Sequence, residues 1–215
     1  MDSNTCNTDL KFSNDVINKI RDLPKYSTKY AGHTEFPFYT HLDEEQKALL
    51  DELIPNEELR ERYKKYGLCD ECNQVNTGGG LYFNETIGWC QSCNSKHCQQ
   101  DFNKWTSGNQ EIDKFIQNFQ LNATCKEEVI EWIPYEKFER VKHLAEGGYG
   151  TVYSANWDDD DGRILGWDIN QNEWRRDHLM VALKELNDSQ NITADFLQEV
   201  CNLLFIDTTL FKVGF

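Results

Sequence analysis

Apolar residues recur at helical spacing in the first part of the chain, and these stretches predict short helices. Leu49, Leu50 and Leu53 lie on one side of a segment that begins with acidic residues and stops at Pro55. Acidic side chains stabilise the first turn of a helix, and proline ends one. Similar patterns predict helices around Asp15–Arg21, from Asn56 to Lys65, and over the stripe Ile112, Phe115, Ile116 and Phe119, capped by Ser107 or Asn109.

The second part of the chain changes to the alternation that is typical of strands. Residues 138–143 alternate between two faces, and Met180–Lys184 is an aliphatic run whose period of two puts Met180, Ala182 and Lys184 on one side. The insertion between them, with a turn at Asn170–Asn172, predicts a hairpin. After these strands the helical period returns at Phe196, Val200, Leu203 and Leu204, with Glu199 beside the apolar stripe.

A glycine-rich run lies between the two predicted strands. Against the template G-x-G-x-x-G-x-V, the stretch Leu144–Val152 matches at Gly147, Gly150 and Val152, and has Ala145 at the first position. Glycines allow the backbone N–H groups of a hairpin to approach phosphate oxygens without a Cβ in the way. An ordinary hairpin turn explains the same glycines, so the residues that follow them decide the interpretation.

The glycine-rich hairpin, the strand lysine and the helix glutamate follow one another in the order found in a known family. From Trp132 to Val200 the chain resembles the N-terminal lobe of protein kinases, with V-A-L-K in place of the V-A-I-K strand. This resemblance implies ATP with Mg²⁺ as ligands and a protein hydroxyl as acceptor. The nucleotide-binding residues that it implies are Leu144, Gly147, Gly150, Val152, Ala182, Lys184 and Glu199, the last of which positions Lys184.

The catalytic segments of the kinase family do not occur in these residues. The chain ends sixteen residues after Glu199 and contains neither H-R-D nor D-F-G. Those segments orient the acceptor hydroxyl and hold Mg²⁺. We therefore expect a small lobe that is truncated before the large lobe and is inactive in phosphoryl transfer. The acceptor, Ser/Thr or Tyr, is left open.

Two C-x-x-C pairs, Cys69/Cys72 and Cys90/Cys93, are separated by seventeen residues. Four thiolates at this spacing can enclose a tetrahedral Zn²⁺, and a closed site of this kind is structural rather than catalytic. Asparagine follows each pair, at positions 73 and 94, where a left-handed backbone is expected. Two alternatives stay open: four reduced cysteines in a small core, or a ligand set in which His97 or Cys98 replaces one cysteine. We expect 78–80 to be a flexible glycine excursion, and the isolated Cys6, Cys125 and Cys201 to be buried apolar residues.

Composition narrows the classes of partner. The chain has 215 residues, a net charge of −15 and a pI near 4.7, whereas nucleic-acid binding needs a basic face. Its N-terminus is polar and acidic, and no run is long and apolar enough for a membrane span. The sequence therefore favours a cytoplasmic protein without nucleic-acid or membrane partners. The four aspartates at 158–161 are interpreted as a solvated turn.

These observations predict an α+β protein in three parts. Residues 1–66 form an irregular and short-helical region, 67–125 a zinc-ribbon-like module with its following amphipathic helix, and 132–215 an incomplete kinase-like lobe with an antiparallel sheet and one helix. Two functions are consistent with this organisation. The first is ATP binding by a kinase-like protein, and the alternative is a zinc-containing protein-interaction module with a non-catalytic kinase-like scaffold.

Overall fold

The computed structural model of the chain describes residues 11–21, 23, 42–82, 85–147, 150–157, 162–177 and 180–186, and in 80–82, 85, 86 and 186 the backbone alone. The chain divides into two compact units, Met1–Lys96 and His97–Phe215. This division differs from the predicted boundaries at 66 and 125. The predicted helix that carries Glu199, the C-terminal tail and the aspartate run at 158–161 lie outside the described residues.

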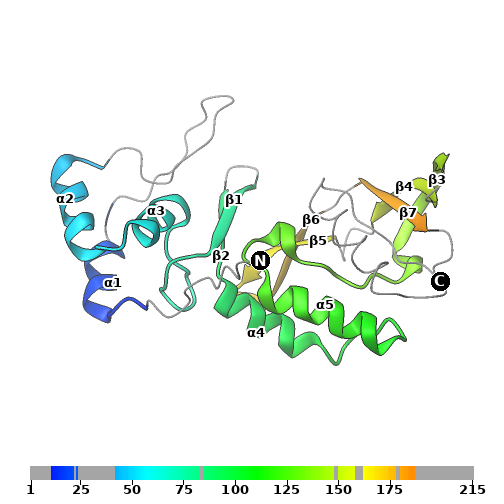
Figure 1. Cartoon of the computed structure of the whole chain (residues 1–215), viewed down its shortest axis with the longest axis horizontal. Helices are drawn as coiled ribbons and strands as arrows, with labels where there is room; N and C mark the ends of the chain where they lie inside the picture. Colours follow the sequence, from blue (N-terminus) through cyan, green and yellow to red (C-terminus); the bar gives the residue numbers. More distant parts are fainter. Residues whose placement is uncertain are drawn as a thin grey trace, which may run out of the picture. The chain divides into compact units, whose positions relative to one another are not determined.

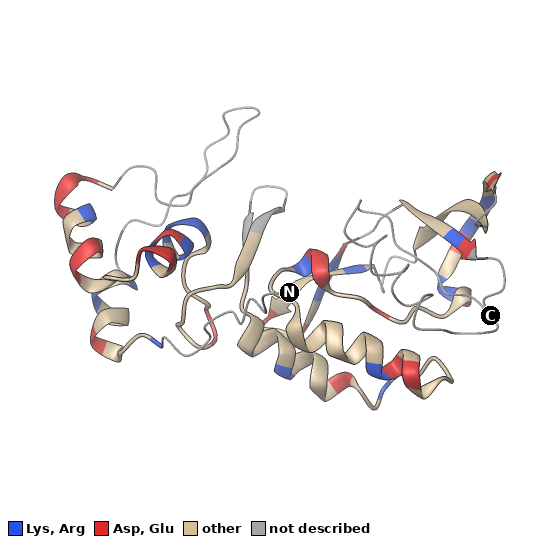
Figure 2. Ribbon diagram, in the orientation of Figure 1, with Lys and Arg blue, Asp and Glu red and all other residues tan. Residues whose placement is uncertain are grey.

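Three helices of the first unit confirm the apolar periodicity: α1 (Asn14–Arg21), α2 (Glu44–Leu53) and α3 (Glu57–Tyr66) (Figure 1). Asp43 and Gln46 form a reciprocal capping box at the start of α2, and Asn56 caps α3 by accepting a hydrogen bond from the backbone of Leu59. Charged residues of both signs cover α2 and α3 (Figure 2). Arg60 Nε lies 2.9 Å from the carboxylate of Asp51 and links the two helices.

The core of the first unit is built where these helices meet. Its buried residues are Ile20, Leu23, Leu42, Leu50, Ile54, Leu59, Tyr63 and Val75. Tyr63 is completely buried, and its hydroxyl donates to the backbone oxygen of Ile20 at 2.8 Å. A single side chain of α3 thus fills the core and satisfies the C-terminal end of α1.

A β-hairpin follows, made of β1 (Gly78–Tyr82) and β2 (Glu85–Trp89). The prediction of a flexible excursion at Gly78–Gly80 is therefore wrong, since all three glycines belong to a strand. Gly79 lies directly opposite Gly88, and a Cβ on either residue would approach a neighbouring atom within 3.0 Å. Close packing, rather than flexibility, accounts for glycine at these two positions.

The helix α4 (Gln91–Asp101) begins directly after this hairpin and was not predicted.

In the second unit, α5 (Gln110–Asn122) confirms the helix that was predicted from the apolar stripe beginning at Ile112. Its N-cap is Asn109, whose side chain accepts hydrogen bonds from the backbone N–H groups of Glu111 and Ile112. Ile112 and Ile116 are buried. Two short 3₁₀ helices, η1 (Lys126–Glu128) and η2 (Tyr135–Lys137), lead into the strands.

The second unit contains an antiparallel sheet in the order β3-β4-β7, formed by β3 (Phe138–Gly147), β4 (Gly150–Trp157) and β7 (Met180–Leu186). The inserted hairpin is also confirmed, as β5 (Arg163–Asp168) paired with β6 (Glu173–Asp177). One face of the sheet is buried and forms a hydrophobic core from Phe138, Ala155, Trp157, Val181 and Leu183. Among the described residues, no helix is long and apolar enough to cross a membrane.

Candidate metal centre

The first cysteine pair lies on a tight knuckle between α3 and β1. An isolated bridge pairs Leu68 with Val75, and the backbone of Cys69 donates to Gln74 O at 2.7 Å. Asn73 has a φ of 57°, so the expected left-handed residue is confirmed at this position. This conformation turns the chain back within a few residues, and asparagine tolerates it better than most side chains.

The second cysteine pair lies at the start of α4. Cys90 precedes the helix and Cys93 is in its first turn, where the backbone of Asn94 donates to Cys90 O at 2.9 Å. Asn94 is buried and helical, so the prediction of a left-handed residue after the second pair is wrong. A helix N-terminus needs no such turn, and its unpaired N–H groups and dipole favour thiolates instead.

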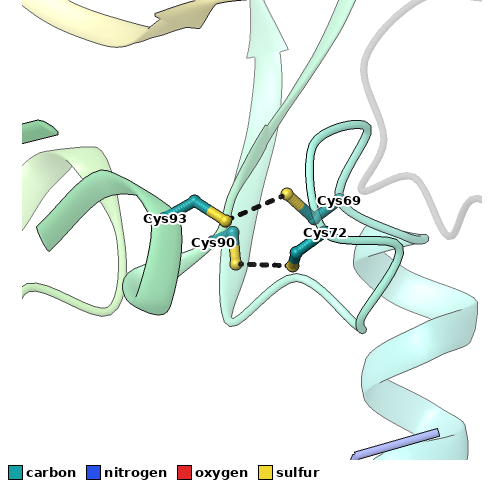
Figure 3. A group of neighbouring side chains, drawn as sticks. All are labelled: Cys69, Cys72, Cys90 and Cys93. Carbon is teal, nitrogen blue, oxygen red and sulfur yellow. Dashed lines mark hydrogen bonds between the residues drawn. The ribbon is translucent and has the colours of Figure 1, made fainter. Parts of the chain in front are cut away.

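The four sulfur atoms converge on one point (Figure 3). Cys69 Sγ lies 3.9 Å from Cys93 Sγ, Cys72 Sγ lies 3.7 Å from Cys90 Sγ, and all four atoms are within 4.8 Å of one another. A tetrahedral ion with bonds of about 2.3 Å to sulfur requires sulfur-to-sulfur distances of about 3.8 Å. These cysteines can therefore hold one metal ion, and no other such group occurs in the part of the chain that the structure describes.

Hydrogen bonds within the cluster lower the pKa of two of the four thiols and raise the pKa of the other two. The hydrogen bond with Cys69 lowers the pKa of Cys72 and of Cys90, and backbone N–H groups of Gln74 and Cys93 lower them further. The pKa of Cys69 is raised by its hydrogen bond with Cys72, and that of Cys93 by its hydrogen bond with Cys69. The cluster thus combines two thiols whose pKa is lowered with two whose pKa is raised, and binding of a metal ion requires that its thiol ligands lose their protons.

The two residues considered as substitute ligands lie in the second unit. His97 stacks on Trp167 with ring centroids 3.8 Å apart, and meets the edge of Trp174. Cys98 is buried, and burial raises its pKa to about 12. The four-cysteine set is complete without either of them. Cys125 is half-buried rather than buried, and its pKa is raised to about 11, mainly by desolvation.

Asn76 and Gly88 support the metal centre from the hairpin. Asn76 is buried, and its Nδ2 donates a hydrogen bond to Tyr66 O at 2.9 Å. The same amide packs directly against Gly88 and occupies the space that a side chain at this position would need. Thr77 Oγ1 donates to Trp89 O at 3.0 Å and accepts from the backbone of Gln91 at 3.0 Å. These contacts connect the end of β2 to the start of α4, where Cys90 lies between them.

We expect Gly88→Ala to destabilise the metal-loaded chain by about 1–3 kcal/mol, because overpacking a filled site forces its neighbours to move. An added Cβ would lie 2.3 Å from Asn76 Nδ2, so the amide would have to leave its bond with Tyr66. Urea unfolding measures the loss. Gly147→Ala is the control, since a Cβ there meets its nearest atom at 4.0 Å. Equal stability of the two variants would contradict the packing argument.

The structure aligns three of the predicted nucleotide-binding residues on one face of the β3-β4-β7 sheet. Val152 lies directly opposite Lys184, and Ala182 opposite Ser154. Side chains opposite one another in an antiparallel pair share a face, and so do residues two apart. Val152, Ala182 and Lys184 are therefore on the face away from the buried Val181 and Leu183.

The part of the chain that the structure describes does not bring the other four predicted nucleotide-binding residues together with these three on one face of the sheet. Gly147 and Gly150 pair at the end of the β3-β4 hairpin, and Gly150 has a φ of 139° that favours glycine. Leu144 is 56% exposed. Glu199 lies outside the described residues, so its predicted ion pair with Lys184 stays a prediction.

The chain matches no protein-family model, no curated protein and no solved structure. The geometry of its own residues is therefore the basis for assigning a function.

Proposed function

We propose that this chain combines a structural zinc centre with a nucleotide-binding sheet of the protein kinase type. For zinc, the supporting observation is the convergence of four sulfur atoms within 4.8 Å, with no nitrogen or oxygen ligand among them. Four thiolates favour Zn²⁺ over harder cations such as Mg²⁺ and Ca²⁺. The closed ligand set has no position for a substrate, so the role of the metal is to stabilise the fold.

Metal content tests the zinc proposal directly. Mass spectrometry under native conditions should find about one zinc per chain, and Co²⁺ substitution should give the absorption of a tetrahedral thiolate complex. Purified chain that contains no metal and takes up none from solution would refute the proposal.

Nucleotide binding is favoured by a different observation, the strand register. Val152 and Lys184 face one another across β4 and β7, with Ala182 next along the same face. In a kinase small lobe the lysine contacts the phosphates, and the small residue two positions earlier leaves room for adenine. We propose that ATP with Mg²⁺ binds on this face beneath the Gly147–Gly150 hairpin. A protein hydroxyl as acceptor follows from the family resemblance alone.

We expect these 215 residues to bind ATP no more tightly than about millimolar, on the order of 4 kcal/mol, and to transfer no phosphate. Lys184→Met should abolish the binding, and Ala145→Gly should at most improve it slightly. Glu185→Gln is the matched control, because Glu185 lies on the opposite face, where its carboxylate accepts from the Tyr153 hydroxyl at 3.1 Å. Perturbation of NMR signals during titration with Mg-ATP measures all four proteins.

Two results would count against this proposal. Binding that survives Lys184→Met unchanged would place the nucleotide elsewhere. Zinc-loaded chain that binds no nucleotide would instead favour the alternative, a zinc-containing interaction module with a kinase-like scaffold. Transfer of labelled phosphate to any protein, lost in Lys184→Met, would refute the expectation of inactivity.

A further inference from the structure

The four cysteines of the metal centre differ in how well the protein shields them from solvent. Cys69, Cys90 and Cys93 are buried, with exposed fractions of 8%, 4% and 4%, whereas Cys72 is only half-buried. Cys72 packs against the other three and lies in a turn of the knuckle. A small molecule in solvent therefore reaches Cys72 before it reaches any other cysteine of the cluster.

Backbone hydrogen bonds to sulfur do not distinguish Cys72 from Cys90. The Cys72 sulfur accepts from the backbone N–H of Gln74, and the Cys90 sulfur accepts from that of Cys93. Bonds of this kind stabilise a thiolate in both residues. Access and thiolate character together determine which cysteine is oxidised. Since Cys90 is buried, Cys72 is the cysteine that a reagent from solvent attacks.

A second cysteine, from a different part of the first unit, is close enough to react with Cys72. Cys90 lies between β2 and α4, and its Sγ is 3.7 Å from Cys72 Sγ (Figure 3). The two sulfur atoms of a disulfide are about 2.05 Å apart, so these two must approach by less than about 2 Å. A movement of the turn that carries Cys72 is sufficient for this approach.

We propose that Cys72 is a redox-sensitive ligand, whose oxidation by a neutral hydroperoxide joins it to Cys90 and releases the metal. This inference rests on the proposed zinc centre. The peroxide transfers one oxygen atom to the Cys72 thiolate, which gives a sulfenic acid and a hydroxide ion. The Cys90 thiolate then attacks the Cys72 sulfur and expels a second hydroxide ion, which forms the disulfide. The peroxide gains two electrons, and the two thiolates lose two.

The disulfide leaves Cys69 and Cys93 as the remaining thiolates of the cluster. Two thiolates do not enclose a tetrahedral ion, so the metal leaves the site. A thiol reductant that cleaves the disulfide restores the four ligands. The stability that the metal contributes to the first unit thus depends on the concentration of peroxide.

The charge around Cys72 favours a neutral oxidant over an anionic one. Asp70 and Glu71 are exposed and directly precede Cys72, and the whole chain has a net charge of −15. Glutathione disulfide is anionic at neutral pH, so these carboxylates repel it, whereas hydrogen peroxide is uncharged. The two oxidants therefore test the role of the acidic knuckle.

The test treats the full 215-residue chain, loaded with zinc, with hydrogen peroxide. Zinc content is measured before the oxidant is added, which tests the zinc proposal separately. A coloured zinc chelator reports the released ion, and mass spectrometry of alkylated peptides identifies the oxidised cysteines. We expect about one zinc to be released for each Cys72–Cys90 disulfide, because the site requires all four thiolates. Dithiothreitol with added zinc should restore the zinc content.

Two variants serve as controls. Cys125→Ser removes a thiol outside the cluster and should release zinc at the same rate as the original chain. The double variant Asp70→Asn with Glu71→Gln should react with hydrogen peroxide at an unchanged rate. It should react with glutathione disulfide about fivefold faster, because two nearby like charges are removed. Circular dichroism and zinc content verify that both variants are folded and loaded.

Three outcomes would overturn this proposal and leave the zinc centre intact. The first is a chain that keeps its zinc while thiols outside the cluster are oxidised. The second is a disulfide within a C-x-x-C pair, either Cys69–Cys72 or Cys90–Cys93, in place of Cys72–Cys90. The third is an unchanged rate with glutathione disulfide in the double variant. A chain without zinc before oxidation would refute the zinc proposal and this inference together.

Discussion

Chelation of the metal is expected to unfold the part of the first unit that surrounds the cysteine cluster. Structural Zn²⁺ contributes an apparent ~10–16 kcal/mol, which equals or exceeds the ~5–15 kcal/mol stability of an ordinary domain. The knuckle at Cys69–Cys72 is held by the Leu68–Val75 bridge, a few backbone hydrogen bonds and the side chain of Gln74, which bonds to the backbone of Phe12. Without the ion, four sulfur atoms within 4.8 Å of one another have little to hold them together.

Cys72→Ser should reproduce the effect of chelation, because three thiolates and a hydroxyl bind Zn²⁺ much more weakly than four thiolates. Cys125→Ser is the control, since Cys125 is half-buried and lies outside the cluster. Circular dichroism and proteolysis, followed alongside zinc content, distinguish the two variants. A metal-free chain that keeps the same far-ultraviolet spectrum and the same resistance to protease would show that the cluster is an ordinary cysteine core.

Tyr63→Ala is expected to have the second largest effect, a loss of about 3–5 kcal/mol, which is typical when a large buried ring is deleted. Tyr63 is completely buried in the core that α1, α2 and α3 share, and the bond from its hydroxyl to Ile20 O would also be lost. Guanidinium unfolding of the zinc-loaded chain measures the change in free energy.

Tyr63→Phe is the matched comparison. It keeps the ring and removes the hydroxyl, so the Ile20 carbonyl loses its 2.8 Å partner but keeps the 3.2 Å hydrogen bond from the backbone of Leu23, at an expected cost of about 0.5–1.5 kcal/mol. A Tyr63→Phe variant as unstable as Tyr63→Ala would mean that the hydrogen bond, rather than the ring, is the main contribution of Tyr63. Both variants should keep their zinc, since the cluster is formed by other residues.

The sequence predicted the cluster of four cysteines correctly because a C-x-x-C pair fixes two thiols on one turn regardless of what surrounds it. It missed α4, whose buried residues are Cys93, Asn94, His97 and Cys98 and which therefore has no apolar stripe of the usual kind. It also misjudged Gly78–Gly80, since glycine is equally compatible with a flexible loop and with a strand that is packed too closely for a Cβ. Such a distinction depends on neighbours that a local pattern does not contain, here the backbone of Ile87 and Gly88 beside Gly79.

The strands of the second unit were more predictable than a cavity of about 390 Å³ in the same unit. Alternation in Met180–Lys184 indicated which side chains share a face, and the buried Val181 and Leu183 agree with it. The cavity is lined by residues from 98 to 176, and no motif or period joins residues so far apart. Four of its lining residues are tryptophans, but a count of tryptophans alone does not indicate that they meet.

The compact spacing of the metal ligands has a consequence for the order of events during synthesis of the protein. Cys69 and Cys93 are only 24 positions apart, so the loop that the ion closes is short and its entropic cost is small. All four ligands leave the ribosome before the first residue of β3, Phe138, has been made. The nascent chain can therefore capture a metal ion and complete its first unit while the three-stranded sheet does not yet exist, so the supply of that metal acts on the protein before the sheet has formed.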